Sequence, residues 1–105
     1  YKAMKKLLKI SNPPTAVLAC SDYMAIGAMN AIFEENWEVP EDVAVIGFDD
    51  LYIDGKIEPP LASVRQEIEE MGKEAAKLFL HILDNPNDFE PIILPATFIW
   101  RRSAG

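Results

Sequence analysis

Short apolar runs recur along the chain and predict the strands of a sheet. The runs TAVLAC at 15–20 and VAVIGF at 43–48 are almost wholly apolar, which is typical of strands buried on both faces of a parallel sheet. Shorter extended pieces are predicted at 61–64, 92–94 and 97–100, the last two separated by a proline.

Between these runs, apolar residues recur at every third or fourth position, which predicts amphipathic helices. The clearest helix covers 67–84, and others cover 22–36 and 1–10. No capping residue precedes Tyr1, so we expect the first helix to begin in a larger protein from which this chain is cut. The alternation of strands and helices predicts an α/β architecture with a mainly parallel sheet flanked by helices.

The composition is that of an ordinary globular protein. A chain of 105 residues, half of them hydrophobic, makes at most one domain with a modest core. No apolar run reaches the roughly 20 residues that a membrane-spanning helix needs, so no membrane partner is expected. The net charge of −7 would repel phosphate backbones, so this chain is not expected to bind nucleic acid itself. The single cysteine, Cys20, favours a reducing compartment and is expected to be inert core.

Polar side chains follow the two apolar strands, at the edge where open parallel sheets bind ligands. Asp49 is the first residue beyond the second strand and is predicted to contact a ligand, with Ser21 as a further candidate. Ser21 and Asp22 are both candidate N-caps of the helix that follows, with a ligand contact as the alternative for Asp22, and Asp50 is expected in a turn or cap. Carboxylates accept hydrogen bonds and donate none, so a sugar or nucleoside suits them better than a phosphate.

The sequence contains no motif for catalysis, for a metal or for a cofactor. A glycine-rich phosphate loop, a zinc ligand set and a Ser-His-Asp arrangement are all absent. His81 has no partner at metal-binding spacing and is expected at the surface. Trp37 and Trp100 are expected to be packing residues. We therefore expect no enzyme, no bound metal and no cofactor.

Five linked motifs lie along nearly the whole chain. The two longest are PTAVLACSDYMAIGA at 14–28 and VPEDVAVIGFDD at 39–50. Shorter motifs follow at 59–66, 71–76 and 94–103. In order and spacing this set resembles the lactose-repressor (LacI/GalR) family of bacterial transcription regulators.

The resemblance implies the C-terminal part of an effector-binding domain of the periplasmic-binding-protein-like (type I) fold, truncated and without the DNA-binding helix-turn-helix. In such cytoplasmic regulators a sugar or related metabolite binds between two lobes and shifts a homodimer between two states. The chain would cross between the lobes near 63–66 and 94–96. A periplasmic sugar-binding protein of the same fold is the alternative, but the motifs at 59–66 and 94–103 favour the regulator.

The resemblance also implies roles for particular positions. Asp49 matches a position that accepts hydrogen bonds from the effector, and Ser21 matches one that is often asparagine. Ile68 matches a position in the pocket wall that is often aromatic, so sugar stacking is not available from it here. The dimer contacts of the family come from the helix after Ser21 and from the stretch before Pro59. These segments predict five interface residues here, namely Met29, Asn30, Tyr52, Ile53 and Ile57.

Two alternatives of other classes stay open on the sequence. Asp22, Asp49 and Asp50 could form a magnesium site of an enzyme or phosphoacceptor domain, although such sites usually add a lysine at a further strand end, and no lysine of this chain occupies such a position. A chain with unpaired strand edges could also simply self-associate.

Overall fold

The computed structural model describes residues 1–88 and 90–105, which form two compact units. The larger unit consists of Tyr1–Arg65 together with Thr97–Gly105, and the smaller unit of Gln66–Ala96. The chain therefore leaves the larger unit once and returns to it for its last residues.

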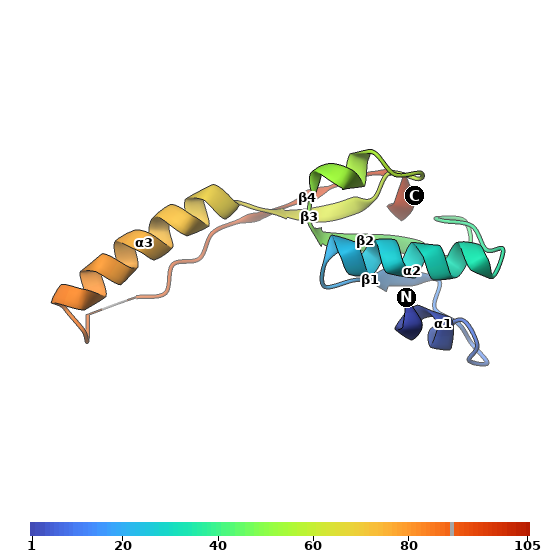
Figure 1. Ribbon diagram of the computed structural model, residues 1–105, viewed down its shortest axis with the longest axis horizontal. Helices are drawn as coiled ribbons and strands as arrows, with labels where there is room; N and C mark the ends of the chain where they lie inside the picture. Colours follow the sequence, from blue (N-terminus) through green and yellow to red (C-terminus); the bar gives the residue numbers. More distant parts are fainter. Residues whose placement is uncertain (89) are drawn as a thin grey trace. The chain divides into compact units, whose positions relative to one another are not determined.

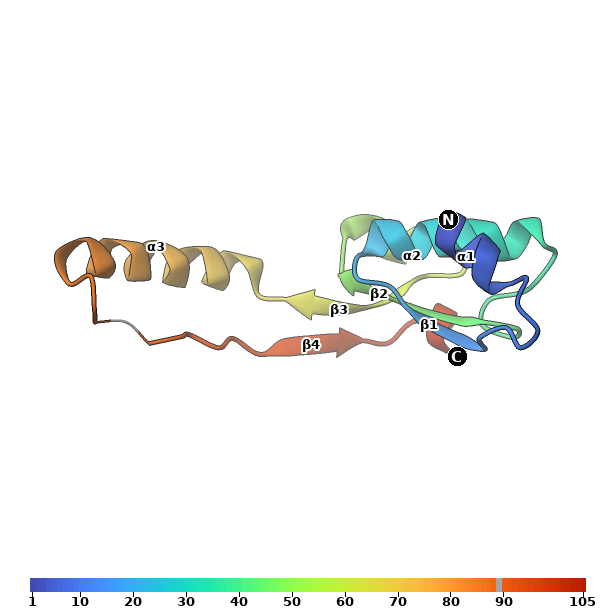
Figure 2. The same ribbon diagram turned by 90° about the horizontal axis from the view of Figure 1, so that it is seen from below.

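A four-stranded sheet forms the centre of the larger unit (Figure 1). Its strands lie side by side in the order β1 (Ala16–Leu18), β2 (Ala44–Asp49), β3 (Ala62–Gln66) and β4 (Ala96–Ile99). The first three strands are parallel, with Leu18 paired to Ile46 and Ile46 to Ala62. In Figure 2 the arrow of β4 runs against that of β3. The predicted α/β fold with a mainly parallel sheet is thus confirmed.

Helices complete the larger unit. They are α1 (Lys2–Leu7), α2 (Asp22–Glu34) and two short 3-10 helices, η1 (Tyr52–Gly55) and η2 (Arg102–Ala104). The helix α2 packs on β2, α1 packs on α2, and η2 packs on β2. Among the described residues, no helix is both long enough and apolar enough to cross a membrane.

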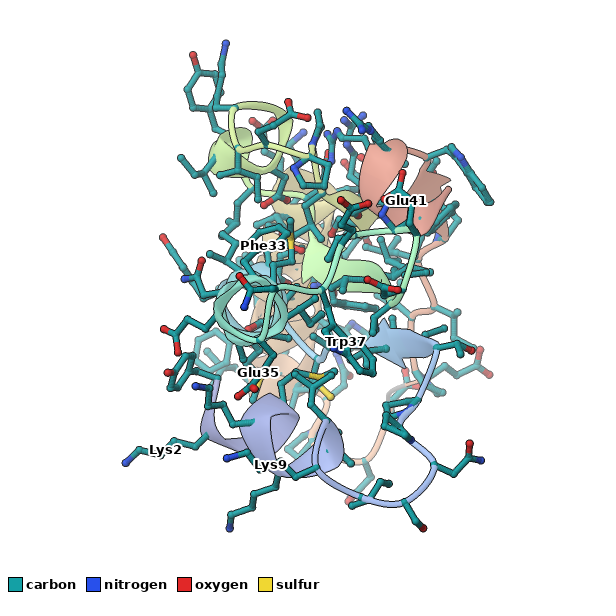
Figure 3. All side chains as sticks on the ribbon, turned by 90° about the vertical axis from the view of Figure 1, so that its right-hand side faces the viewer. Lys2, Lys9, Phe33, Glu35, Trp37 and Glu41 are labelled. Carbon is teal, nitrogen blue, oxygen red and sulfur yellow. The ribbon has the colours of Figure 1, made fainter. Side chains whose placement is uncertain are left out.

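The hydrophobic core lies between α1, α2 and the sheet. Its buried members are Met4, Leu8, Ala25, Ala28, Met29, Ala31, Ile32, Val39, Val43, Val45 and Leu61. Trp37 packs against this cluster and points into the molecule, whereas Lys2 and Lys9 point outward (Figure 3). The packing role expected for Trp37 is confirmed.

The smaller unit contains one long amphipathic helix, α3 (Ile68–Asp84), followed by an extended stretch. Met71, Ala75 and Leu78 of α3 line a shallow cleft together with Ile92 and Leu94. No residue of α3 is fully buried, so its apolar face is only partly covered within this unit.

Three expectations about strands and burial are wrong. Residues 92–94 are apolar but not a strand, because Pro91 and Pro95 flank them and neither has an N–H to give to a neighbouring strand. The strand β1 is the edge of the sheet, so Leu18 is 67 % exposed rather than buried. Cys20, which follows β1, is likewise exposed rather than part of the core.

Two further residues considered in the sequence, Trp100 and His81, lie at the surface. Trp100 is largely exposed and is not a core residue; its ring meets Phe98 edge to face, and its Nε1 donates to the Gly105 carbonyl at 2.7 Å. His81 is at the surface as expected, with its Nε2 3.3 Å from a carboxylate oxygen of Asp88.

One buried serine ties the C-terminal residues to the sheet. The hydroxyl of Ser103 donates to the Val45 carbonyl at 2.6 Å and accepts from the backbone N–H of Ala62 at 2.8 Å. The backbone N–H of Ser103 in turn donates to the Pro60 carbonyl at 3.0 Å. Ser103 is fully buried, so no solvent replaces these partners.

Replacing this serine is expected to destabilise the protein. Ser103→Ala leaves the Ala62 N–H and the Val45 carbonyl buried without the hydroxyl, which costs about 1–3 kcal/mol. Urea unfolding measures the loss. The control Ser11→Ala removes an exposed hydroxyl and should change stability by less than about 0.5 kcal/mol. Equal effects of the two variants would contradict the tying role of Ser103.

Candidate functional site

The carboxyl ends of β1 and β2 bring the predicted ligand residues to one edge of the sheet. Leu18 of β1 is paired with Ile46 of β2 in a parallel ladder. Ser21 and Asp49 each lie three residues beyond this pair in the chain. Asp49 is predicted just beyond the second strand, but in the structure it is the last residue of β2 and still pairs with Arg65 of β3. This carboxyl edge is the one at which open parallel sheets bind ligands.

The turn after β2 has an unusual backbone. Asp49 has a φ of 119° and Asp50 a φ of 57°, although neither is glycine. Such conformations cost on the order of 1–3 kcal/mol each and persist only where surrounding contacts impose them. The contacts that impose this turn come from three other parts of the chain.

The first contact is the buried carboxylate of Asp22. Its Oδ1 accepts from the Ser63 hydroxyl at 2.6 Å, and its Oδ2 accepts from the backbone N–H of Leu51 at 2.9 Å. The N-cap of α2 is Ser21, whose hydroxyl accepts from the Met24 N–H at 3.3 Å. Of the two candidate N-caps, Ser21 is confirmed and Asp22 is wrong; Asp22 instead anchors the turn from inside the protein.

The second contact is the hydroxyl of Ser63 on β3. While it donates to Asp22, it also accepts from the backbone N–H of Asp50 at 3.0 Å. Ser63 is fully buried. The start of α2, the turn after β2 and the strand β3 are thus joined through one side chain.

The third contact is a pair of arginines on the carboxylate of Asp50. Arg65 donates to its Oδ2 from both Nε and Nη2 at 2.6 Å, and Arg101 donates to its Oδ1 at 2.6 Å. Burial alone would raise the pKa of Asp50, but the hydrogen bonds and charges of Arg101 and Arg65 outweigh it and hold this pKa below its ordinary value. Asp50 is therefore ionised and fully engaged, which a simple turn residue would not need to be.

The neighbouring strand makes room for Asp22 because residue 47 is glycine. A Cβ on Gly47 would lie 2.1 Å from Oδ1 of Asp22 and 3.2 Å from its Cα. No side chain fits this space while the carboxylate keeps its position. The glycine of the VIGFDD run is thus required by close approach rather than by backbone conformation.

Comparisons with known proteins agree on one family. The family model described as the periplasmic binding protein-like domain matches residues 1–104. The chain belongs to this family. The resemblance to lactose-repressor regulators is also confirmed by the similar proteins.

Three of these similar proteins illustrate the match. The chain is 42 % identical over 97 residues to the "Probable HTH-type transcriptional repressor ExuR" of Bacillus subtilis (strain 168), covering 92 % of this chain and 29 % of that protein. It is 28 % identical to the Lac repressor dimer bound to operator and the anti-inducer ONPF, with a TM-score of 0.89 over 99 % of this chain and 36 % of that one. It is 36 % identical to the regulator CelR in its cellobiose complex, with a TM-score of 0.85 over 97 % of this chain and 32 % of that one.

The chain thus spans about a third of the length of the regulators it matches. Within the periplasmic binding protein-like domain, the described residues contain no group of three or more acidic, histidine or cysteine side chains that could hold a metal ion. Asp22 and Asp50 already have donors, which disfavours the magnesium site that the sequence left open.

The four predicted ligand residues lie in different surroundings. Ser21 and Asp49 are half-buried and follow the neighbouring strand ends described above. Asp22 is fully buried with both oxygens engaged, so a ligand contact for it stays a prediction that its burial disfavours. Ile68 begins α3 in the smaller unit and is 60 % exposed there.

The predicted dimer residues all lie in the larger unit but differ in their exposure. Tyr52 and Ile53 on η1 are 85 % and 41 % exposed. Asn30 and Ile57 line one small cleft together with Met29. Met29 is 2 % exposed, so most of its side chain serves the core.

Sequence reasoning missed the residues that hold the turn. Ser63 and Arg65 belong to a recognised motif, and Arg101 to another, but neither motif indicates what its side chains contact. One signal was the polar residue Ser63 in an apolar strand segment. In the structure both Ala62 and Ser63 of β3 are buried. A buried hydroxyl needs a partner, so its presence predicts one.

The close approach at Gly47 gives a stability prediction. Gly47→Ala places a methyl group against the Asp22 carboxylate and is expected to cost about 3 kcal/mol, because the backbone or the anchor must move. Thermal or urea unfolding measures the loss. Gly55→Ala is the matched control, since nothing lies within 4 Å of a Cβ at that position. A Gly47→Ala variant as stable as the control would show that the anchor does not constrain the strand.

Proposed function

We propose that this chain is the C-terminal portion of the effector-binding and dimerisation domain of a ligand-responsive bacterial transcription regulator, located in the cytoplasm. The observation that supports the proposal is the turn at the carboxyl end of β2, which contacts from Asp22, Ser63 and the arginines hold next to Asp49. Ser21 follows the carboxyl end of the neighbouring strand β1. DNA binding would belong to a part of the protein outside this chain. We assign no catalytic role.

The chemistry of this edge suits a sugar-like effector. Asp49 offers carboxylate oxygens and Ser21 offers a hydroxyl, which together can bind the hydroxyl groups of a sugar. A neighbouring phosphate would be repelled by the acidic strand ends. The similar regulator CelR forms a complex with cellobiose, and a similar repressor binds the anti-inducer ONPF. The names of the curated relatives favour a regulator over a secreted sugar-binding protein.

Rigidity is the second reason to place the ligand contact at Asp49. A contact residue binds with less entropic cost when the protein has already fixed its position. The Asp22, Ser63 and Asp50 contacts fix the backbone on the C-terminal side of Asp49. On the other side, Asp49 is still in register with Arg65 of β3. A polar loop residue without these contacts would lack this fixed position.

The ligand role of Asp49 can be tested in the full-length gene product. A thermal-shift panel of mono- and disaccharides, nucleosides and sugar phosphates first identifies a binder, which should be neutral and rich in hydroxyl groups. Asp49→Ala should then weaken this binder about 10- to 100-fold in calorimetry, since a hydrogen bond to a charged group contributes about 1.5–3 kcal/mol.

The matched control is Glu41→Ala, which removes an exposed acid from the loop before β2 (Figure 3). It should leave the affinity unchanged. A panel in which only anionic phosphates bind, or an Asp49→Ala variant with full affinity, would refute the proposed site.

The dimer role can be tested separately. Ile53→Glu places an uncompensated charge on η1, which should raise the dimer dissociation constant at least about 100-fold if η1 is buried in the interface. Analytical ultracentrifugation of the full-length gene product measures it. Ile10→Glu is the control, since Ile10 is a similarly exposed isoleucine outside the predicted interface. An unchanged dimer with Ile53→Glu would exclude η1 from the interface.

A further inference from the structure

A buried acid on η1 lacks the partners that its charge would need. Asp54 is fully buried, and neither oxygen of its carboxyl group accepts a hydrogen bond from any described residue. Its backbone is satisfied, because its N–H donates to the Leu51 carbonyl at 3.0 Å and its carbonyl accepts from Leu61 at 2.8 Å. An ionised carboxylate without donors would cost several kcal/mol in this position.

The neighbouring acid, Asp22, differs in this respect. Its two oxygens accept from the Ser63 hydroxyl and from the Leu51 N–H, and both donors stabilise the ionised form. Two adjacent buried carboxyl groups cannot both ionise cheaply. Asp54, which has no donor, is therefore the better site for a proton. A protonated carboxyl group has an O–H to donate, and a neighbouring carboxylate can accept it.

The other charges around Asp54 agree with this assignment. Burial is the largest cause that raises the pKa of Asp54, followed by the hydrogen bond and the negative charge of Asp22. Arg101, on the stretch after β4, and the backbone N–H of Leu51 lower this pKa. The guanidinium of Arg101 is already paired with Asp50, and the N–H of Leu51 already donates to Asp22. The pKa of Asp54 is raised from 3.8 to about 7.

We propose that Asp22 and Asp54 share one proton, and that this hydrogen bond holds η1 against the turn next to Asp49 in a pH-dependent way. The same residue, Leu51, donates its N–H to the Asp22 carboxylate and accepts the backbone N–H of Asp54 on its carbonyl, so these contacts include the first turn of η1. The outer side of η1 carries the exposed Tyr52. This inference goes beyond the proposed function, because the pair binds its proton whether or not a ligand or a second subunit is present.

The direction of the pH dependence follows from the raised pKa. When η1 opens, Asp54 is exposed to water and its pKa returns toward the ordinary value of 3.8. Opening therefore releases the proton at intermediate pH. The closed form is fully favoured below about pH 4. The equilibrium constant for closing falls about tenfold for each pH unit between the two pKa values and does not fall further above about pH 7.

Hydrogen exchange of the full-length gene product tests this. Mass spectrometry of a peptide covering residues 51–56, corrected for the pH dependence of exchange in an unfolded peptide, measures the opening of η1. In the natural protein, protection should fall about tenfold per unit from pH 5 to 7 and then level off. In Asp54→Asn, the amide keeps a donor toward Asp22 at every pH, so protection should not depend on pH.

Glu41→Gln is the control and should follow the natural protein, since Glu41 is an exposed acid on another loop. A flat profile in the natural protein, or a sloping profile in Asp54→Asn, would overturn the proposal. So would protection that follows added Mg²⁺ or Ca²⁺ at constant pH, because a cation and not a proton would then compensate the pair. If Asp54→Asn does not fold, carbon-13 detection of the aspartate carboxyl groups in the natural protein decides: one should titrate near pH 7, and its absence would refute the shared proton.

Discussion

The larger unit depends on how it accommodates one charge in its interior, the carboxylate of Asp22. A buried carboxylate is tolerated only with donors in place, and here they are the Ser63 hydroxyl and the Leu51 N–H. These donors come from a strand and from a turn that lie 41 and 29 residues further along the chain. Satisfying this charge therefore brings three segments together, and Gly47 leaves the space that the carboxylate occupies.

A second set of ionic contacts surrounds this anchor. Arg65 and Arg101 hold the carboxylate of Asp50, whose side chain is only 4 % exposed. Arg101 also donates to the Leu61 carbonyl at 2.6 Å, which attaches the last residues of the chain to β3. These ion pairs fix the side chain of Asp50, which follows directly after the strained backbone of Asp49. The C-terminal stretch is thus part of the support of the proposed ligand site.

The two proposed surfaces, one for ligand and one for the partner subunit, meet at η1. Its inner side carries Asp54 against Asp22, and its outer side carries Tyr52. Any change that alters the turn after β2 must alter the same hydrogen bonds that position η1, because Leu51 belongs to both. Coupling between the proposed ligand surface and the proposed dimer surface therefore needs no long chain of contacts. The turn at Leu51 and the proposed shared proton are enough.

The sequence by itself determined the order and approximate bounds of the helices and of the main strands, because periodicity is a local property. It also placed Ser21 and Asp49 at one edge, since parallel strands end together. Only the tertiary structure decided the surroundings of the buried acids: Asp22 is far from both Asp54 and Ser63 in the sequence, 41 residues from Ser63, and is brought to them only when the sheet forms. Burial is likewise a property of the folded chain, which is why the apolar strand β1 proved to be an exposed edge.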